Sequence, residues 1–232
     1  LYATLGDVAK PEINIITVED PVEFRMRGIN QVQVNNKAGM TFAAALRSIL
    51  RADPDVVLIG EIRDQETANI AIEASLTGHL VLSTLHTNDA PSAVTRLTEM
   101  GVEPFLLSSS LAAVMAQRLA RRLCKKCKRQ DTATEAELRT LGVPHMPDTP
   151  LPTIWRPVGC RECANTGYSG RVAIQQVMGV DSTMEDLIAR GATSIDIDKA
   201  AKEQGMTTLR KDGWQKALQG ITSVEEVLRV TV

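Results

Sequence analysis

The chain has 232 residues, a formal net charge of -2 and aromatic residues at only 3% of its positions. This length accommodates one large domain or two small ones, and the near-neutral charge gives no general affinity for nucleic acid or anionic lipid. The sequence has no signal peptide and no apolar run of the roughly 18 residues that a membrane-spanning helix needs, so we expect a cytosolic chain that contacts membranes only through protein partners.

The first half of the sequence alternates short apolar strands with helices. Three apolar segments read as strands, the second of them without any polar alternation: 13–18, 55–60 and 80–84. Three further segments have the features of helices, two of them behind the N-cap candidates Asp64 and Asp89: 41–51, 65–76 and 91–100. Strands separated by helices of this length predict a parallel, doubly wound α/β sheet.

The second half changes character. Residues 132–157 are polar and rich in proline, which predicts a loop or irregular insertion. Helical patterns then return in four segments: 184–189, 197–204, 208–218 and 224–230. We therefore expect three consecutive parts: a sheet-containing core at 1–123, a cysteine-bearing subdomain at 124–178 and a helical C-terminal subdomain at 179–232.

Polar side chains follow each of the expected strands. Glu19 and Asp20 follow the first strand, Glu61 follows the second, and His86 follows the third, beside Thr84. Ligands of open parallel sheets bind beyond the carboxyl ends of the strands, where a carboxylate can hold Mg²⁺ or polarise an attacking water and a polar cluster can sense a terminal phosphate.

Each of these motifs also has a structural interpretation. Glu61 can pair with Arg63 or cap the next helix, the acidic turn before Pro21 can be merely solvated, and a lone histidine such as His86 is more often structural than catalytic. Three clusters at one sheet edge are much less easily explained by chance, which favours a phosphate site.

The four cysteines form two CxxC pairs, Cys124 with Cys127 and Cys160 with Cys163. The 32 residues between the pairs exceed the usual spacing, but a loop of that length can close. Four thiolates predict a closed, structural zinc site; a redox dithiol pair and a vestigial site are the alternatives.

A basic run surrounds the first cysteine pair. Seven Lys and Arg side chains lie between residues 118 and 129. Beside a cysteine knuckle such a run is compatible with nucleic-acid binding, although a solvated helix end and knuckle is the simpler interpretation. The near-neutral charge and the scarcity of aromatic side chains for base stacking also weigh against a zinc-containing nucleic-acid-binding module.

Six stretches of the sequence together resemble the secretion ATPases, which power type II secretion and type IV pilus assembly. The stretches are ITVEDPVEFR, LRADPDVVLIGEIRD, GHLVLSTLHTNDAPSAVTRL, CKKC, CRECANTGYSGR and QGITSVEEVLRVT. The resemblance covers nearly the whole chain. It implies a RecA-like P-loop NTPase core that uses ATP and Mg²⁺, with a tetracysteine Zn²⁺ site.

The resemblance also implies residue roles. Glu19 resembles the catalytic glutamate of the family's Asp box, Glu61 the glutamate of its atypical Walker B motif near Mg²⁺, and His86 the His-box residue near the γ-phosphate. Charge stabilisation at the nucleotide would come from among five nearby arginines, with Thr84 as a further candidate contact: Arg25, Arg47, Arg51, Arg63 and Arg96.

The implied function is ATP hydrolysis by a homo-hexamer that powers pseudopilus assembly for type II secretion, docked on platform proteins at the bacterial inner membrane. Type IV pilus assembly is the alternative. Pilus retraction is disfavoured, because retraction ATPases of the family lack the cysteine knuckle.

One family motif does not occur in the sequence. The GxxxxGK[ST] loop, or Walker A motif, is absent, and residues 1–5 resemble the helix that follows it. Its backbone N–H groups and lysine hold the phosphates. We therefore expect the chain by itself to bind ATP poorly and to turn over little; it could instead be an oligomerisation and zinc-binding piece.

Overall fold

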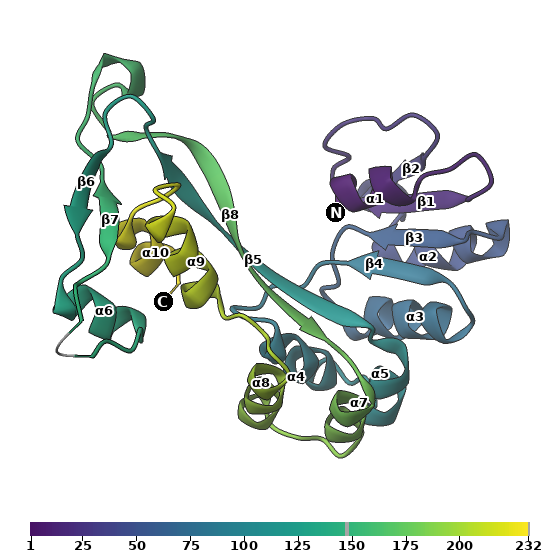
Figure 1. The fold of residues 1–232 in the computed structure, drawn as a ribbon. Helices are drawn as coiled ribbons and strands as arrows, with labels where there is room; N and C mark the ends of the chain where they lie inside the picture. The colour runs from purple at the N-terminus through teal and green to yellow at the C-terminus, as the bar shows by residue number, and fades with distance from the viewer. Residues whose placement is uncertain (147–148, 232) are drawn as a thin grey trace. The chain divides into compact units, whose positions relative to one another are not determined.

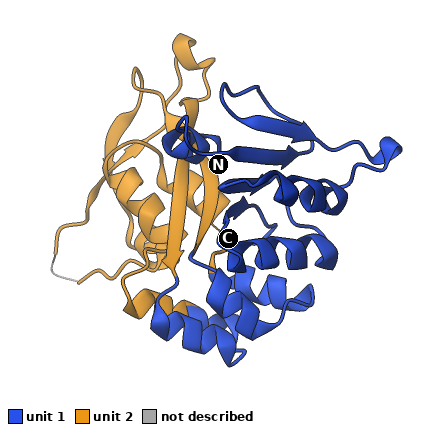
Figure 2. Cartoon of the chain, turned by 90° about the vertical axis from the view of Figure 1, so that its right-hand side faces the viewer, with its two compact units in different colours: residues 1–87, 91–112, 180–197 blue, residues 88–90, 113–179, 198–232 orange. Residues whose placement is uncertain are grey.

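The computed structural model describes residues 1–146 and 149–231, which form two compact units (Figure 2). Unit 1 comprises residues 1–87, 91–112 and 180–197, and unit 2 comprises residues 88–90, 113–179 and 198–232. The units are interleaved along the chain, so their boundaries differ from those of the three consecutive parts expected from the sequence.

The centre of unit 1 is a sheet of four parallel strands in the order β2-β1-β3-β4 (Figure 1). The strands are β1 (Ile15–Glu19), β2 (Asn30–Gln33), β3 (Val56–Ile59) and β4 (Leu80–Ser83). The parallel α/β sheet expected from the sequence is confirmed. Because the strands are parallel, the chain leaves β1, β3 and β4 at the same edge of the sheet.

Helices accompany the sheet of unit 1. On one face, Leu5 of α1 (Tyr2–Val8) packs with Ile15, Val56 and Leu58. The alternate strand residues, such as Val18 and Ile59, point to the opposite face and are fully buried. Contacts join α2 (Phe42–Ile49) to β1, and α3 (Gln65–Leu76) to β4 and to α2.

The predicted cap of α3 is present, and α2 has one of its own. The Asp64 side chain accepts a hydrogen bond from Thr67 N at the start of α3, and Thr41 accepts one from Ala44 N at the start of α2. The remaining elements of unit 1 are η1 (Asn36–Ala38), η2 (Leu50–Ala52), α4 (Pro91–Glu99), α5 (Pro104–Ser110) and α7 (Ser182–Ala189). Helix α8 (Ser194–Glu203) begins in unit 1 and ends in unit 2.

Unit 2 is built around a long antiparallel ribbon that the sequence patterns did not predict. Strand β5 (Ala113–Leu123) pairs with β8 (Tyr168–Gly179), with an irregularity between Arg121 and Leu123. The basic run therefore lies largely on a strand and the following turn, and the expectation of a helix end is wrong. Helices α9 (Leu209–Leu218) and α10 (Val224–Val230) pack against the ribbon.

The segment expected to be irregular contains regular structure. It holds α6 (Glu135–Leu141) and lies largely between β6 (Arg129–Thr132) and β7 (Thr153–Arg156), which pair antiparallel. A capping box between Thr134 and Glu137 starts α6. Side chains from these elements, the ribbon and the last two helices form one core: Ala120, Ala133, Leu138, Leu141, Ile154, Ile174, Leu209, Trp214, Ala217, Val224 and Val227.

No helix in residues 1–146 and 149–231 is both long enough and apolar enough to cross a membrane.

Candidate functional site

The three residues predicted to be catalytic, Glu19, Glu61 and His86, lie at one edge of the sheet in unit 1. Glu19 is the last residue of β1, Glu61 follows β3 by two residues, and His86 follows β4 by three. Since β1, β3 and β4 are neighbours and parallel, the structure brings the three positions to the same rim.

Two of the three side chains meet directly. Glu61 Oε2 lies 3.3 Å from His86 Nε2 and 2.5 Å from Arg63 Nε. The Glu61 side chain is 13% exposed, whereas that of His86 is 85% exposed. The Arg63 guanidinium is the main reason that the pKa of Glu61 lies below its usual range. Burial acts in the opposite direction and raises this pKa, and His86 lowers it by a smaller amount than Arg63 does. The carboxylate is therefore ionised at neutral pH and able to hold a cation or accept a proton.

The backbone beside Glu61 comes very close to β1. Gly60 N donates to Val18 O at 2.7 Å, and a Cβ at Gly60 would lie 3.2 Å from that oxygen and 3.3 Å from Glu19 Cα. A side chain at residue 60 would therefore require the ends of β1 and β3 to move apart by a few tenths of an ångström. Thr84, expected at the nucleotide, donates to Gly60 O at 2.7 Å, and so helps to hold β4 beside β3.

Glu19 lies on the same rim, but its side chain has other partners. It is 4% exposed and accepts hydrogen bonds from Tyr2, Thr17 and Gln31. Among the described residues, no hydrogen bond joins Glu19 to Glu61 or to His86. The three expected residues thus share one edge, while only two of them are in contact.

The five candidate arginines are spread over unit 1, and only Arg63 touches the Glu61–His86 pair. Arg47 pairs with Glu66, and the Arg96–Glu99 pair spans 3.5 Å on α4. Arg25 donates to Gln31 O at 3.3 Å, and Arg51 lies exposed in η2.

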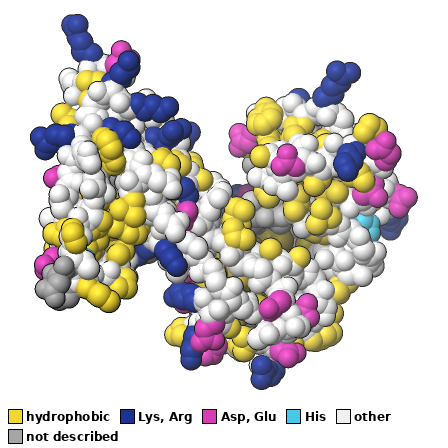
Figure 3. All heavy atoms as spheres, in the orientation of Figure 1, with side chains coloured by type: hydrophobic (Ala, Val, Ile, Leu, Met, Phe, Trp, Pro, Cys, Tyr) yellow, Lys and Arg dark blue, Asp and Glu magenta, His cyan; other side chains and the backbone are white. Residues whose placement is uncertain are grey.

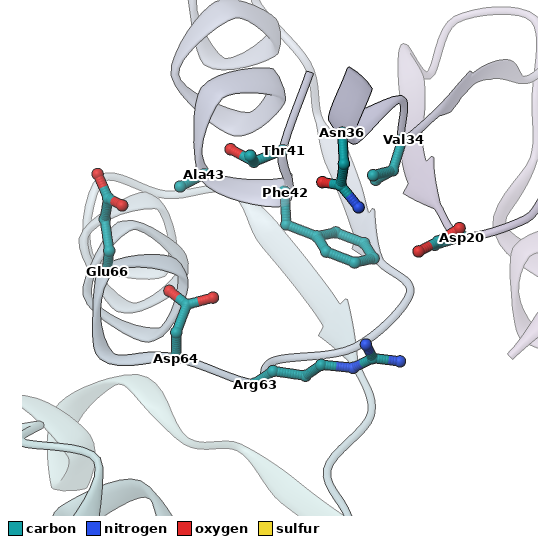
Figure 4. Close-up of a pocket in the computed structure, with 9 residues that line it drawn as sticks. All are labelled: Asp20, Val34, Asn36, Thr41, Phe42, Ala43, Arg63, Asp64 and Glu66. Atoms are coloured by element: carbon teal, nitrogen blue, oxygen red, sulfur yellow. The ribbon is translucent and has the colours of Figure 1, made fainter. Parts of the chain in front are cut away.

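A pocket of about 270 Å³ lies next to this rim (Figure 4). Its lining comes from the ends of β1 and β2, the start of α2 and the start of α3: Asp20, Val34, Asn36, Thr41, Phe42, Ala43, Arg63, Asp64 and Glu66. Arg63 is shared with the Glu61 cluster, and Figure 4 shows its guanidinium extended toward Asp20. Arg63 is thus placed to respond to a ligand in the pocket as well as to Glu61.

The four cysteines come together in unit 2. Their sulfur atoms all lie within 4.8 Å of one another, and the Cys124–Cys160, Cys127–Cys163 and Cys160–Cys163 contacts measure 3.9, 3.9 and 3.8 Å. A tetrahedral zinc site with Zn–S bonds of about 2.3 Å has S···S edges of about 3.8 Å. The donor set and its dimensions therefore fit a zinc ion.

The surroundings of the cysteines act differently on two of the thiols: burial raises the pKa of Cys127 to about 11, whereas the turn after Cys160 favours the Cys163 thiolate. Burial acts to raise the pKa of Cys163, but N–H groups of Cys160 and Gly167 donate to its sulfur and the net effect is a lowered pKa of about 6. Gly167 has φ of 77°, and a Cβ there would meet Pro157 Cβ at 2.5 Å. Figure 3 shows Lys and Arg side chains on the surface of unit 2, and exposed Lys125, Lys126 and Arg161 lie within the CxxC pairs.

Sequence reasoning missed the residues that surround Glu19. Tyr2, Thr17 and Gln31 drew no attention, because each is an ordinary residue in its own segment. One signal was present for Thr17, a polar residue two positions before Glu19 in an apolar strand and therefore on the same face. The contributions of Tyr2 and Gln31 depend on helix docking and strand pairing.

A family model described as "Type II/IV secretion system protein" matches residues 1–229. The type II secretion system protein E of Aeromonas hydrophila is 51% identical over 231 residues, which cover 100% of this chain and 45% of that protein. The protein of the same name from Pseudomonas aeruginosa is 54% identical, again over 100% of this chain and 45% of its own length. The type IV pilus assembly ATPase PilB of Thermus thermophilus is 50% identical over 100% of this chain and 26% of its own length.

Solved structures show the same fold. The pilus retraction motor PilT with bound ADP aligns with a TM-score of 0.67 and 25% identity, over 94% of this chain and 52% of PilT. The Legionella pneumophila ATPase DotB aligns with a TM-score of 0.63 and 21% identity, over 94% of this chain and 51% of DotB.

The chain spans less than half the length of the curated relatives described above. The resemblance inferred from the motifs is confirmed over almost every residue: this chain belongs to the type II/IV secretion system protein family.

Proposed function

We propose that the chain is the ATP-hydrolysing part of a motor that drives pseudopilus assembly in type II secretion. The observation that carries the proposal is the convergence of Glu61, Arg63 and His86 at the sheet edge where Glu19 ends β1. The names of the relatives agree with it, since they include type II secretion proteins and a pilus assembly ATPase. On this proposal the sheet of unit 1 is a RecA-like P-loop NTPase core.

Each rim residue has a distinct part in the proposed reaction. Glu19 acts as general base toward the attacking water, and His86 responds to the terminal phosphate. Glu61 is the residue that would hold Mg²⁺, which neutralises charge on the phosphates. Arg63 can exchange its pairing with Glu61 for contact with the nucleotide. The remaining candidates serve at subunit boundaries or hold the rim in shape: Arg25, Arg47, Arg51, Arg96 and Thr84.

The four cysteines hold a structural Zn²⁺ in this proposal. A site with four thiolates leaves no coordination position open for substrate, so the metal stabilises unit 2 and takes no part in hydrolysis. The motor works as a homo-hexamer in the cytoplasm, attached to the inner membrane through platform proteins. Type IV pilus assembly is the second candidate function, and the 50% identity with PilB favours it. Genes for pilins rather than pseudopilins next to the gene of this chain would support type IV pilus assembly over type II secretion.

The test of the proposed function is ATP turnover by a chimera. The matching 231-residue segment of the Aeromonas hydrophila relative is replaced by this chain, and phosphate release is measured with and without Glu61→Gln. We expect the substitution to lower kcat by roughly 100-fold or more while ATP binding is retained, because the charge that organises the reaction is removed and the strands are untouched.

The matched control is Glu73→Gln, which removes one exposed carboxylate from α3, away from the rim. It should turn over ATP at the parent rate. Near-parent hydrolysis by the Glu61→Gln chimera would remove the basis of the proposed site.

A further inference from the structure

The Glu19 carboxylate is buried and accepts hydrogen bonds from three side chains. It is 4% exposed, and burying an ionised carboxylate is very costly unless hydrogen bonds replace its hydration. Its Oε1 accepts from Thr17 Oγ1 at 2.5 Å and from Gln31 Nε2 at 3.1 Å, and its Oε2 accepts from the Tyr2 hydroxyl. The orientation of this carboxylate is therefore set by three side chains.

Two of the donors come from the sheet itself. Thr17 precedes Glu19 by two residues on β1 and so lies on the same face. Gln31 is the register partner of Thr17 on the parallel strand β2. The amide oxygen of Gln31 accepts from Met26 N at 2.7 Å, which turns its NH₂ group toward Glu19. These two donors move only if the strands move.

The third donor comes from helix α1. Tyr2 and Leu5 are three residues apart and share one face of the helix. Leu5 packs in the core with Ile15, four residues before Glu19 on β1. The phenol ring of Tyr2 meets the ring of Phe24 edge to face, with centroids 4.5 Å apart. Tyr2 is thus fixed over the end of β1 by packing on its ring.

The direction of the Tyr2 hydrogen bond is also determined. Glu23 N donates to the Tyr2 hydroxyl oxygen at 3.2 Å, so the single proton of that hydroxyl is free for the Glu19 carboxylate. Burial first, and then the hydrogen bond to Glu19, raise the pKa of Tyr2 above its ordinary value of 10.0. The phenol remains protonated, and a donor, throughout the neutral range.

We propose that Tyr2 is a positioning residue that orients the Glu19 carboxylate, and that through Tyr2 the first turn of α1 controls the direction in which Glu19 faces. The proposal rests on the proposed function, in which Glu19 is the general base. Thr17 and Gln31 hold Oε1 from within the sheet, whereas Oε2 is held by a side chain of helix α1, outside the sheet. A displacement of α1 would therefore change the orientation of the Glu19 carboxylate without disrupting the hydrogen bonds of the sheet.

The first experiment tests the contact in this chain without any turnover. The chain has two tyrosines, so Tyr168→Phe leaves Tyr2 as the only phenol, and its ionisation is followed by ultraviolet absorbance. We expect a midpoint above 10.0 that falls when Glu19→Gln is added, because the carboxylate that favours the protonated phenol is lost. Readings are limited to the pH range in which the circular dichroism is constant. An unchanged midpoint would overturn the proposed contact.

The second experiment is a double-mutant cycle on the ATP turnover of the chimera. We expect Tyr2→Phe, which keeps the ring on Phe24, to lower kcat about tenfold with little change in KM. Combined with Glu19→Gln, it should lower kcat less than about twofold further, because a positioning residue acts only through its partner. A merely structural role would instead give additive losses, and additive losses or parent-like turnover by Tyr2→Phe would overturn the inference.

The two substitutions distinguish the proposed role of Glu19 as base from the proposed positioning role of Tyr2. Parent-like turnover by Glu19→Gln would contradict the role of Glu19 as base, and with it the positioning role, whatever the absorbance titration shows. A large loss with Glu19→Gln and none with Tyr2→Phe would contradict the positioning role alone. The matched control is Tyr168→Phe, which removes an equivalent hydroxyl, bonded to Ser223 in unit 2, and should leave turnover at the parent rate.

Discussion

At the sheet rim of unit 1, Glu61 and His86 project from short loops beyond the strands, whereas in unit 2 the four cysteine sulfurs face one another. The His86 side chain is 85% exposed and is not part of the buried core. The first site is open toward ligands and the second is closed around its own donors. Substitutions should therefore affect chemistry at the first site and stability at the second.

The surroundings of the cysteines strengthen this contrast. Leu123 N donates to Ile221 O at 2.9 Å, and Lys128 Nζ donates to Gly220 O at 2.7 Å while lying 4.4 Å from the centre of the Trp155 ring. The residues on both sides of the first CxxC pair are thus attached to the connection between α9 and α10. Loss of the cysteine cluster should spread to the last two helices.

The largest expected effect is that of Cys127→Ser. If the cysteines hold Zn²⁺ as proposed, removal of one thiolate should release it and lower the free energy of unfolding of unit 2 by more than about 3 kcal/mol, because metal binding is coupled to folding. Both tryptophans, Trp155 and Trp214, lie in unit 2, so denaturation followed by their fluorescence reports on this unit.

The control for that substitution is Lys125→Ser, inside the same CxxC motif but not a ligand, and elemental analysis gives the metal content. Full metal content in Cys127→Ser would show that this thiolate is not needed to hold the metal, and the contrast between the two sites would weaken.

A smaller effect is expected for Glu226→Gln. The Glu226 side chain is 1% exposed and bonded to Arg121 and Arg229. Burial opposes the ionised form, but the two arginines prevail and the pKa falls from 4.5 to about 2. A pKa depressed in the folded state stabilises the fold above about pH 5 and loses that contribution as the pH falls toward 2.

We therefore expect Glu226→Gln to lower the free energy of unfolding of unit 2 by about 2 kcal/mol at pH 7 and to flatten its decline in acid. Urea denaturation at a series of pH values measures both. The neighbouring Glu225→Gln, whose carboxylate is 53% exposed beside Arg156, should change stability by less than about 1 kcal/mol. Equal effects of the two substitutions would contradict the importance of burial at residue 226.

The smallest expected change in stability is that of Gly60→Ala. Its Cβ would press on Val18 O and Glu19 Cα, which should cost about 1 to 2 kcal/mol and spread the ends of β1 and β3. ATP turnover of the chimera should fall while the tryptophan transition of unit 2 stays in place. Gly6→Ala is the control, since a Cβ there meets nothing within 4 Å and alanine favours a helix. A parallel loss in both units would show that they unfold together.

Much of unit 1 could be predicted because its strands are buried and its helices have local start signals. Helix α3 covers the predicted range 65–76 and begins at the predicted Asp64 cap, and β3 was visible as an uninterrupted apolar run. The shared rim followed from parallel strand order alone. The side-chain direction of Glu19 did not, because it depends on α1 and β2, which approach from elsewhere in the sequence.

Unit 2 was predicted less well for identifiable reasons. On β5, the buried residues Ala116 and Ala120 are small, whereas the larger apolar residues Met115 and Leu119 are exposed, so the sequence of this strand does not show which face is buried. Helix α6 and its capping box were not predicted, because the segment around them is rich in proline and was interpreted as irregular. Arg156 binds Asp131, Glu137 and Glu225, and no local pattern predicts a meeting of residues so far apart in the chain.

The interleaving of the two units has a consequence for synthesis. Helix α7 belongs to unit 1, packs against α5 and buries Met184 and Ile188 to 0% and 1% exposure, yet the ribosome makes it after nearly all of the cysteine-bearing segment. A nascent chain therefore presents the apolar side of α5 uncovered while more than sixty intervening residues, 113–179, are translated. An expression fragment ending before residue 182 would carry the same uncovered surface.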